Sequence, residues 1–84
     1  MSGQALDAAG LVRVLVEPIV EYKDELVVTE TVTENGDILV EIDVNEEDTG
    51  KVIGRQGRVI KSIRTLARAA ASRVGERVEV ELID

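Results

Sequence analysis

Residues 50–60 read Gly50-Lys51-Val52-Ile53-Gly54-Arg55-Gln56-Gly57-Arg58-Val59-Ile60. The two glycines of this G-x-x-G spacing have an apolar Val-Ile pair before them and another after them. Glycine adopts backbone angles that are closed to other residues, and it has no Cβ atom to hold a ligand away. Such a short motif often arises by chance, so the flanking sequence decides what it indicates.

Helical patterns flank the two glycines. Asn45 is a good N-cap and three acidic residues follow it, which favours a short helix from residue 46 to about Ile53. A second helix is predicted to begin near Gly57 or Arg58 and to end at Gly75, a common residue at helix C-termini. Its apolar positions keep helical spacing: Val59, Ile60, Ile63, Leu66, Ala67, Ala70 and Val74.

Strand patterns enclose this helical pair. Residues 26–34 and 37–44 are predicted strands, joined at Asn35-Gly36, the dipeptide that most readily accepts the positive φ of a tight hairpin turn. Residues 78–83 form a third predicted strand with apolar and acidic side chains in alternation. We assign the acidic residues of the strands to the outer face of a sheet rather than to a metal or catalytic site: Glu30, Glu41, Asp43, Glu79 and Glu81.

An apolar stripe at helical spacing precedes the strands, comprising Ala8, Leu11, Val12, Leu15 and Ile19. Proline is poorly tolerated inside a helix, so this helix should end or restart near Glu17, before Pro18. Tyr22-Lys23-Asp24 then reads as a turn. The predicted order is helix, strand, strand, helix, helix, strand, in one domain of residues 1–84 with a loose tail at residues 1–5.

The composition excludes several classes of function. The 84 residues include no cysteine, no histidine and one aromatic residue, Tyr22. The commonest general base, the thiol nucleophile and the usual transition-metal ligands are therefore missing, and we expect neither an enzyme nor a cofactor. Modules that stack bases on aromatic side chains are disfavoured too. No apolar run approaches a membrane span and no signal-peptide pattern begins the chain, so a cytoplasmic protein is expected.

The net charge of −7 conceals a basic segment. Residues 1–48 carry a charge of −11, residues 49–77 carry +7, and residues 78–84 carry −3. At physiological ionic strength charges are screened beyond about 8 Å, so a ligand on the basic segment would feel mainly the local field. A partner that carries phosphate is therefore compatible with an acidic chain.

The G-x-x-G turn has the features of a phosphate site. The second helix begins there, so its unpaired N–H groups face outward with a partial positive charge. Arg55 and Gln56 stand at the tip as hydrogen-bond donors, and basic residues flank them on both sides: Lys51, Arg58 and Lys61. Lys61, Arg64 and Arg68 follow helical steps and should share a face that adjoins the turn.

The Val-Ile-Gly-Arg-Gln-Gly-Arg-Val-Ile core, in this order of elements, resembles a K-homology (KH) domain of the type II, bacterial arrangement. With the run Ile63-Arg64-Thr65-Leu66 and an Ala-rich helix end, the chain is similar to the KhpA (YlqC) family of small bacterial RNA-binding proteins from about Leu11 to Asp84. The resemblance implies an α+β fold of order α-β-β-α-α-β, a three-stranded mixed sheet with helices packed on one face. It also implies a groove with an aliphatic floor, in which the G-x-x-G loop clamps about four nucleotides of single-stranded RNA.

Two functions remain in competition. The first is a non-enzymatic RNA-binding module, an RNA chaperone or post-transcriptional regulator, with these site residues: Lys51, Gly54, Arg55, Gln56, Gly57, Arg58, Lys61 and Arg64. The second is a dimerisation or adaptor module, in which Leu39, Ile83 and the first helix supply apolar contacts. The resemblance supports both, because KhpA-like proteins pair with themselves and with a larger KH protein of the KhpB (Jag) type. The structural alternatives are a plain helix-to-helix turn and a solvated basic helix face.

Overall fold

The computed structural model describes residues 6–83, so the predicted tail at residues 1–5 lies outside the described part of the chain. The elements are α1 (Ala8–Val16), the 3-10 turn η1 (Lys23–Glu25), β1 (Val27–Val32), β2 (Ile38–Asp43), α2 (Glu46–Ile53), the 3-10 turn η2 (Arg55–Gly57), α3 (Arg58–Arg73) and β3 (Val78–Leu82). The predicted α-β-β-α-α-β order is confirmed. Within residues 6–83, no helix combines the length and apolarity that a bilayer crossing requires.

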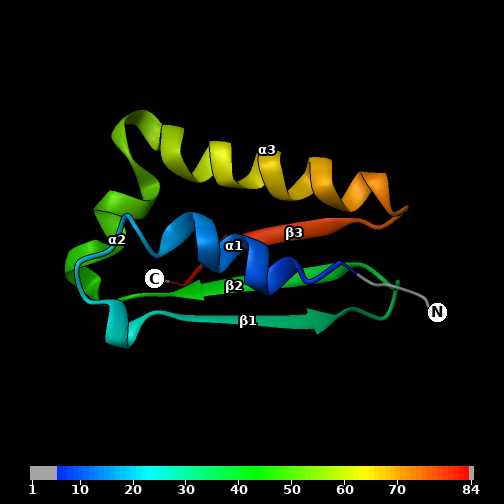
Figure 1. Cartoon of the computed structure of the whole chain (residues 1–84), viewed down its shortest axis with the longest axis horizontal. Coiled ribbons are helices and arrows are strands. Elements are labelled where there is room, and N and C mark those ends of the chain that lie inside the picture. The colour runs from blue at the N-terminus through cyan, green and yellow to red at the C-terminus, as the bar shows by residue number, and fades with distance from the viewer. Residues whose placement is uncertain (1–5, 84) are drawn as a thin grey trace.

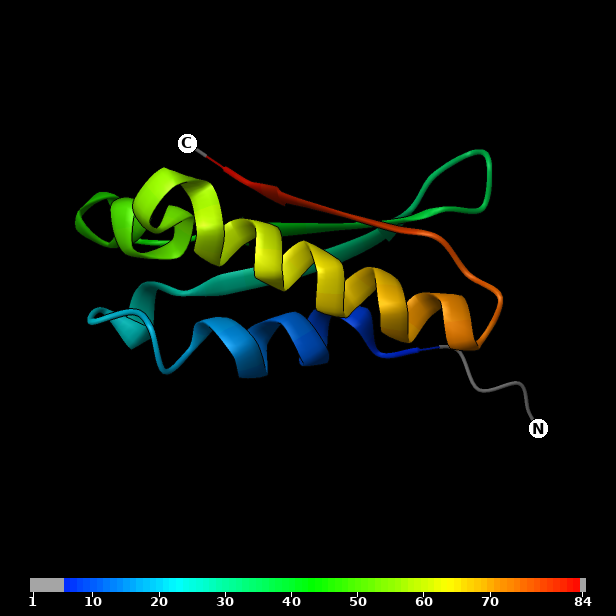
Figure 2. The same ribbon diagram turned by 90° about the horizontal axis from the view of Figure 1, so that it is seen from above.

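The three strands form one mixed sheet in the order β1-β2-β3. β1 and β2 are antiparallel, while β2 and β3 are parallel and are connected through α2 and α3. α1 and α3 lie along the same side of this sheet, and the opposite face carries no helix of the described chain (Figures 1 and 2). This arrangement is the two-layer α+β architecture that the alternating strands predict.

The register separates an apolar face of the sheet from an acidic one. Ile38, Val40 and Ile42 of β2 are buried, and Val78 and Val80 of β3 lie beside the first two of them in the register. Four of the five acidic strand residues alternate onto the opposite face, as predicted: Glu41, Asp43, Glu79 and Glu81. The helices complete an aliphatic core, to which α1 contributes Ala8, Val12 and Val16 and α3 contributes Ile60, Ile63, Ala67 and Ala71.

The prediction for Glu30 was wrong. Glu30 is the register partner of Val40, so its side chain lies on the face that the helices cover. Its Oε1 accepts a hydrogen bond of 2.9 Å from the backbone N–H of Ala9, in the first turn of α1, where amides lack partners within the helix. Val27 and Val28 are both apolar, so the sequence of β1 does not specify which of its faces is inward.

The β1–β2 hairpin is wider than the predicted tight turn. Thr33 N–H donates to Asp37 O at 2.8 Å, and Gly36 N–H donates to Thr33 O at 2.9 Å. A two-residue turn of type I′ needs positive φ at both central residues, whereas only Gly36 has one here, at +85°. The connection is therefore a three-residue loop with glycine at its left-handed position.

The predicted helix boundaries are confirmed. α1 ends at Val16 with Glu17 as its C-cap, one residue before Pro18. At the end of α3, Gly75 has a φ of +75°, its N–H donates to Ser72 O, and the next amide, Glu76 N–H, donates to Ala71 O. This pair of bonds is a Schellman motif, which stops the helix and turns the chain into β3.

Candidate nucleic-acid interface

A buried carboxylate positions α2, the helix that leads into the G-x-x-G turn. Asp48 is fully buried, and its two oxygens accept hydrogen bonds from the backbone N–H groups of Glu21 at 3.0 Å and Tyr22 at 2.9 Å. Lys51 Nζ lies 3.3 Å from Asp48 Oδ1 and 3.3 Å from Glu21 Oε1. These contacts hold α2 against the segment that follows α1. They therefore fix the position of the G-x-x-G turn, which begins at the C-terminal end of α2.

These contacts shift two pKa values in opposite directions. Burial alone raises the pKa of the Asp48 carboxyl, but the amides of Glu21 and Tyr22 and the ammonium of Lys51 outweigh it and hold this pKa below its ordinary value. The carboxylates of Glu21 and Asp48 raise the pKa of Lys51. Lys51 thus keeps its charge, but Asp48 and Glu21 compensate that charge, and the predicted role of Lys51 in attracting phosphate is correspondingly weaker.

Gly54 and Gly57 have the backbone geometry that the motif predicts. Gly54 ends α2 with φ +78° and ψ 172°, a combination open essentially to glycine alone. A Cβ atom at Gly54 would collide with the side chain of Val59 and lie 2.8 Å from the Val59 backbone nitrogen. Gly57 has a φ of +75° and is the N-cap residue of α3. The turn is therefore sharp because neither glycine carries a side chain.

Gln56 is the one residue other than glycine with a positive φ in residues 6–83, at +58°. A left-handed conformation costs an ordinary L-residue about 1–2 kcal/mol, so the surrounding turn holds Gln56 in place. Its side-chain Oε1 accepts a hydrogen bond of 3.0 Å from Arg58 Nη2. This bond places the Arg58 guanidinium over the tip of the turn.

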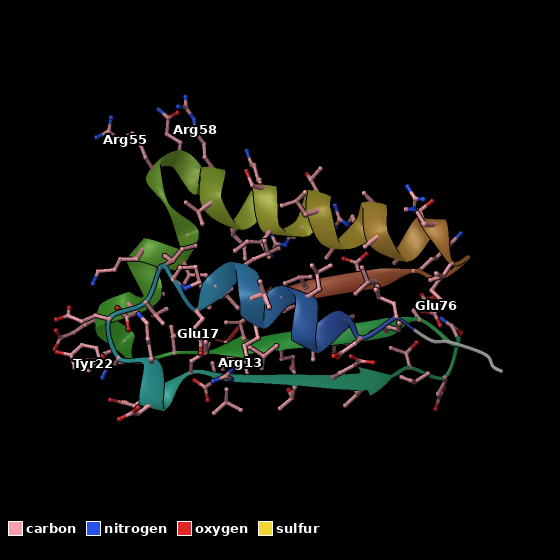
Figure 3. All side chains as sticks on the ribbon, viewed as in Figure 1. Arg13, Glu17, Tyr22, Arg55, Arg58 and Glu76 are labelled. Carbon is pink, nitrogen blue, oxygen red and sulfur yellow. The ribbon has the colours of Figure 1, made fainter. Side chains whose placement is uncertain are left out.

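The tip of the turn is exposed and basic. Arg55, Gln56 and Arg58 are all exposed, and Arg55 and Arg58 project away from the body of the domain (Figure 3). No side chain caps the N-terminus of α3. The stem of Lys61 runs alongside, with its Cε 4.0 Å from the position that a Cβ on Gly57 would occupy. An uncapped helix N-terminus with cationic side chains around it is a favourable site for an anion.

The predicted basic face of α3 is divided in the structure. Lys61 is exposed next to the turn. Arg64, however, is partly buried and its Nε donates to the backbone carbonyl of Val80 at 2.9 Å, while Arg68 Nη2 lies 3.1 Å from Glu79 Oε1. Arg64 and Arg68 therefore fasten α3 to β3, and the structure places Arg64 apart from the tip.

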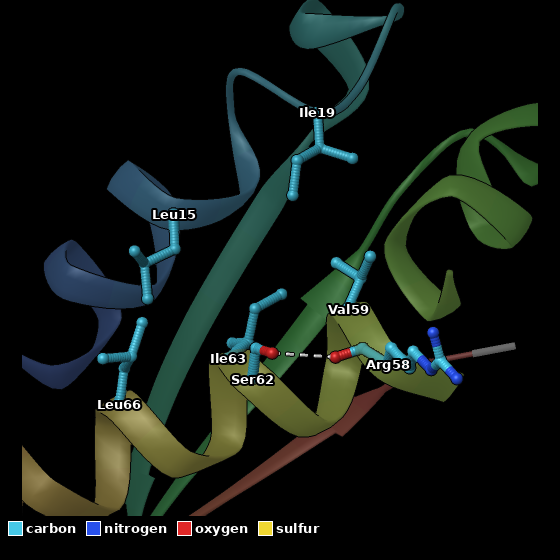
Figure 4. A pocket seen from close by; sticks show the side chains of 7 residues that line it. All are labelled: Leu15, Ile19, Arg58, Val59, Ser62, Ile63 and Leu66. Atoms are coloured by element: carbon cyan, nitrogen blue, oxygen red, sulfur yellow. Dashed lines mark hydrogen bonds between the residues drawn. The ribbon is translucent and has the colours of Figure 1, made fainter. Parts of the chain in front are cut away.

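An apolar groove lies between α1 and α3, close to the turn (Figure 4). It has a volume of about 330 Å³ and is lined by Leu15, Ile19, Arg58, Val59, Ser62, Ile63 and Leu66. Leu66 was grouped with the apolar positions of its helix, but its side chain is 51% exposed. Helical spacing places Leu66 on the apolar side of α3 and gives no sign that a groove stays open between it and Leu15 of α1.

The family model for the KhpA/KhpB KH domain matches residues 9–82. The chain belongs to this KH-domain family. Proteins named "RNA-binding protein KhpA" are similar over most of their length. The one from Clostridium acetobutylicum is 45% identical over 87% of this chain and 96% of its own, and the one from Listeria monocytogenes is 35% identical over 88% of this chain and 96% of its own. The description of the KhpA/KhpB family is not that of an enzyme family, in agreement with the composition.

The fold of this chain also resembles part of a solved structure. The chain aligns with Era, crystallised with MgGDPNP and nucleotides 1506–1542 of 16S ribosomal RNA, at a TM-score of 0.63 and 23% identity. The alignment covers 98% of this chain and 35% of Era. At this level of identity the likeness concerns the fold alone.

Proposed function

We propose that this KH domain binds single-stranded RNA through the turn at residues 54–57 and the first turn of α3. The observation that carries the proposal is the exposed, positive-φ G-x-x-G turn at an uncapped helix N-terminus, with two guanidinium groups projecting from it. The names of the KhpA relatives support RNA as the ligand. The match over residues 9–82 supports treating residues 1–84 as one KH domain.

Each residue at the turn has a distinct role in this proposal. The amides of Gly57 and Arg58 donate to Gly54 O and Arg55 O within the turn, so the amides that follow them in the first turn of α3 are the ones left for phosphate. The side chain of Arg55 holds phosphate beside them, because its guanidinium presents N–H donors. Gly57, where a Cβ would meet only Lys61 Cε, allows the close approach of the RNA backbone, and Gly54 makes the sharp bend against Val59. Gln56 contacts the backbone or a base edge, and Arg58 and Lys61 attract the strand. Lys51 and Arg64 stay in the proposed site as secondary members, since their nearest partners are protein groups.

A single site of this kind binds weakly and with little sequence selectivity, because phosphate contacts carry no base information. Such behaviour suits an RNA chaperone or post-transcriptional regulator in the cytoplasm. The partial exposure of Ile53, at 38%, is consistent with an aliphatic surface for bases beside the turn.

The experiment that tests RNA binding compares two double variants with the same change in charge. Arg55→Asp with Gln56→Asp alters the tip of the turn, and Ser72→Asp with Arg73→Asp alters the exposed far end of α3. Fluorescence anisotropy with a labelled single-stranded RNA should detect loss of binding for the first variant and retained binding for the second. Equal affinities, with circular dichroism unchanged for both, would remove the turn from the mechanism.

We also infer a second function, pairing with another KH domain, either a second copy or a KhpB-like protein. The groove between α1 and α3 supports it, because Leu66 and Val59 leave apolar surface open beside α1. Sedimentation velocity with and without RNA separates the two functions. Leu66→Glu should reduce self-association and leave RNA binding by a monomer intact, whereas self-association unaffected by Leu66→Glu would exclude the groove.

A further inference from the structure

The two edges of the sheet differ in how far other parts of the chain cover them. At the β3 edge, side chains of α3 reach the strand: Arg64 Nε bonds Val80 O at 2.9 Å and Arg68 pairs with Glu79 at 3.1 Å. At the opposite edge, Arg13 of α1 bonds the carbonyl just before the strand, Leu26 O, at 3.3 Å. No helix or loop of residues 6–83 lies beyond β1, which forms the lower margin of the molecule in Figure 1. The β1 edge is therefore open from Val28 to Val32.

The register identifies the backbone groups on the open edge. The bond from Thr33 N–H to Asp37 O closes the hairpin, and residues of an antiparallel strand alternate between bonding their neighbour and pointing away from it. Val27, Thr29 and Thr31 thus bond to β2, whereas the N–H and C=O groups of Val28, Glu30 and Val32 point outward. The hydrogen bonds found within residues 6–83 do not include these outward backbone groups.

Natural edge strands carry Lys or Pro, bulge, are short, or point a charged side chain inward. Of these features the sequence of β1 has only the last, the inward Glu30. β1 has six residues in regular register, of which all but Glu30 are valine or threonine. The carboxylate of Glu30 is engaged with the Ala9 amide on the helix side. β1 is therefore well suited to accept another extended chain by backbone hydrogen bonding.

The charge around β1 indicates which chain fits. Seven acidic residues lie on β1, on the neighbouring strand or in the adjoining turns: Asp24, Glu25, Glu30, Glu34, Asp37, Glu41 and Asp43. Two cations lie near the start of the strand, Lys23 in η1 and Arg13, which bonds Leu26 O, so the excess of negative charge remains. β1, β2 and β3 themselves contain only acidic charges. A second copy would thus add an acidic strand to an acidic edge, and like charges on adjacent strands are destabilising.

We propose that the open edge of β1 binds an extended, lysine- or arginine-bearing segment of another protein as a fourth strand of the sheet. The three outward N–H and C=O pairs supply its backbone hydrogen bonds, and the surrounding carboxylates select its basic side chains. The edge is on the far side of the sheet from β3 and its cover, α3 (Figure 1). The G-x-x-G turn stays accessible while this segment is bound.

The test uses two model peptides of seven residues, one alternating lysine with valine and one alternating glutamate with valine. In a titration of the ¹⁵N-labelled protein, the lysine peptide should shift the amide signals of Val28, Glu30 and Val32 and slow their hydrogen exchange. The glutamate peptide should bind about tenfold more weakly or not at all. Asp43→Lys should reduce that preference, since Asp43 lies beside Val27 in the register.

A matched pair of variants isolates the backbone contact. Val32→Pro removes an outward N–H and leaves the ladder to β2 intact, and proline is tolerated on edge strands in this orientation. Val32→Ala keeps that N–H. Val32→Pro should bind the lysine peptide about fivefold more weakly than Val32→Ala does, a difference that corresponds to one hydrogen bond.

Three outcomes would overturn the proposal. The first is equal affinity of the two variants while their spectra remain those of a folded protein. The second is a set of shifts confined to the acidic face around Glu41 and Glu79, with the edge amides unmoved. The third is self-association of the free protein that Val32→Pro abolishes, because the occupant would then be a second copy.

Discussion

Two constraints act together on Gly54: its backbone angles and the lack of space for a Cβ atom. Its φ and ψ lie where a side chain is poorly tolerated, and Val59 occupies the space that a Cβ would need. Gly57 has the first constraint, but a Cβ there would meet only the Cε of Lys61, at 4.0 Å. Gly54 is therefore the more demanding position of the motif.

Gly54→Ala should lower the free energy of unfolding by about 2–4 kcal/mol, because backbone strain and a collision with the Val59 backbone act together. Gly50→Ala is the matched control. Gly50 lies inside α2, and a Cβ there would meet nothing within 4 Å. Urea denaturation should find Gly50→Ala more stable than the parent by about 0.5–1 kcal/mol. Equal changes in the free energy of unfolding for Gly54→Ala and Gly50→Ala would mean that Val59 shifts easily to make room for the added Cβ.

Asp48 predicts a specific response to acid. The pKa of Asp48 is lowered in the folded state, so its contribution to stability is present above the unfolded pKa and is lost as pH falls through the lower, folded value. Melting temperatures measured between pH 6 and the acid limit should fall less steeply for Asp48→Asn than for the parent. Asp48→Asn should also melt earlier at neutral pH, because one backbone amide loses its carboxylate acceptor. If the melting temperatures of Asp48→Asn and of the parent fell in parallel with pH, the carboxylate of Asp48 would not have this role in stability.

Among the elements, α3 has the most varied surroundings. One side contributes to the core, another borders the apolar groove, and a third is fastened to β3 by Arg64 and Arg68. Helical periodicity predicted the first of these sides. The other two depend on how α1 packs against α3 and on where β3 runs, and neither is encoded in α3 itself.

Arg64→Met should destabilise the domain by about 1–2 kcal/mol, because the Val80 carbonyl loses a charged donor on the β3 edge. Arg73→Met removes the same charge from an exposed position and should change stability by less than about 0.5 kcal/mol. Thermal denaturation of both variants measures the difference. A smaller loss for Arg64→Met than for Arg73→Met would show that the bond to Val80 contributes nothing net.

At the scale of the whole molecule, the acidic and basic charges are on different parts of the surface. The outer face of the sheet is acidic, and three exposed cations gather at the turn: Arg55, Arg58 and Lys61. Two further exposed cations, Arg73 and Arg77, lie at and beyond the other end of α3. An anionic strand can therefore meet the turn first, although the net charge is −7. This separation also limits how many phosphates one domain can neutralise.

About three phosphate contacts predict that log K for single-stranded RNA falls with log salt at a slope of roughly −2. Anisotropy titrations over a series of salt concentrations measure this slope. Arg58→Gln should reduce its magnitude by about 0.7, the share of one phosphate, while the Ser72→Asp, Arg73→Asp control should leave it unchanged. A slope near zero would mean that phosphate is not what the turn binds.

The order of elements, the helix ends and the glycine turn could be predicted from the sequence, because each depends on local chemistry. Pro18, Asn45 and Gly75 act within a few residues, and so do the left-handed angles of Gly54 and Gly57. The alternation of β2 and β3 also determined which face of the sheet is buried. The prediction of a tight turn at Asn35-Gly36 was wrong, because a three-residue loop also places a glycine, Gly36, at a positive φ.

Tertiary structure alone decided which charged residues are available at the surface. Lys51, Arg64 and Glu30 belong to the chemical classes that the sequence predicts, yet each is engaged by a group 16 to 30 residues away in the chain. The exposure of Leu66 and the open edge of β1 were decided in the same way. Periodicity specifies what kind of side chain lies on a face of a helix or strand. Contacts between elements determine whether that face is covered or stays exposed.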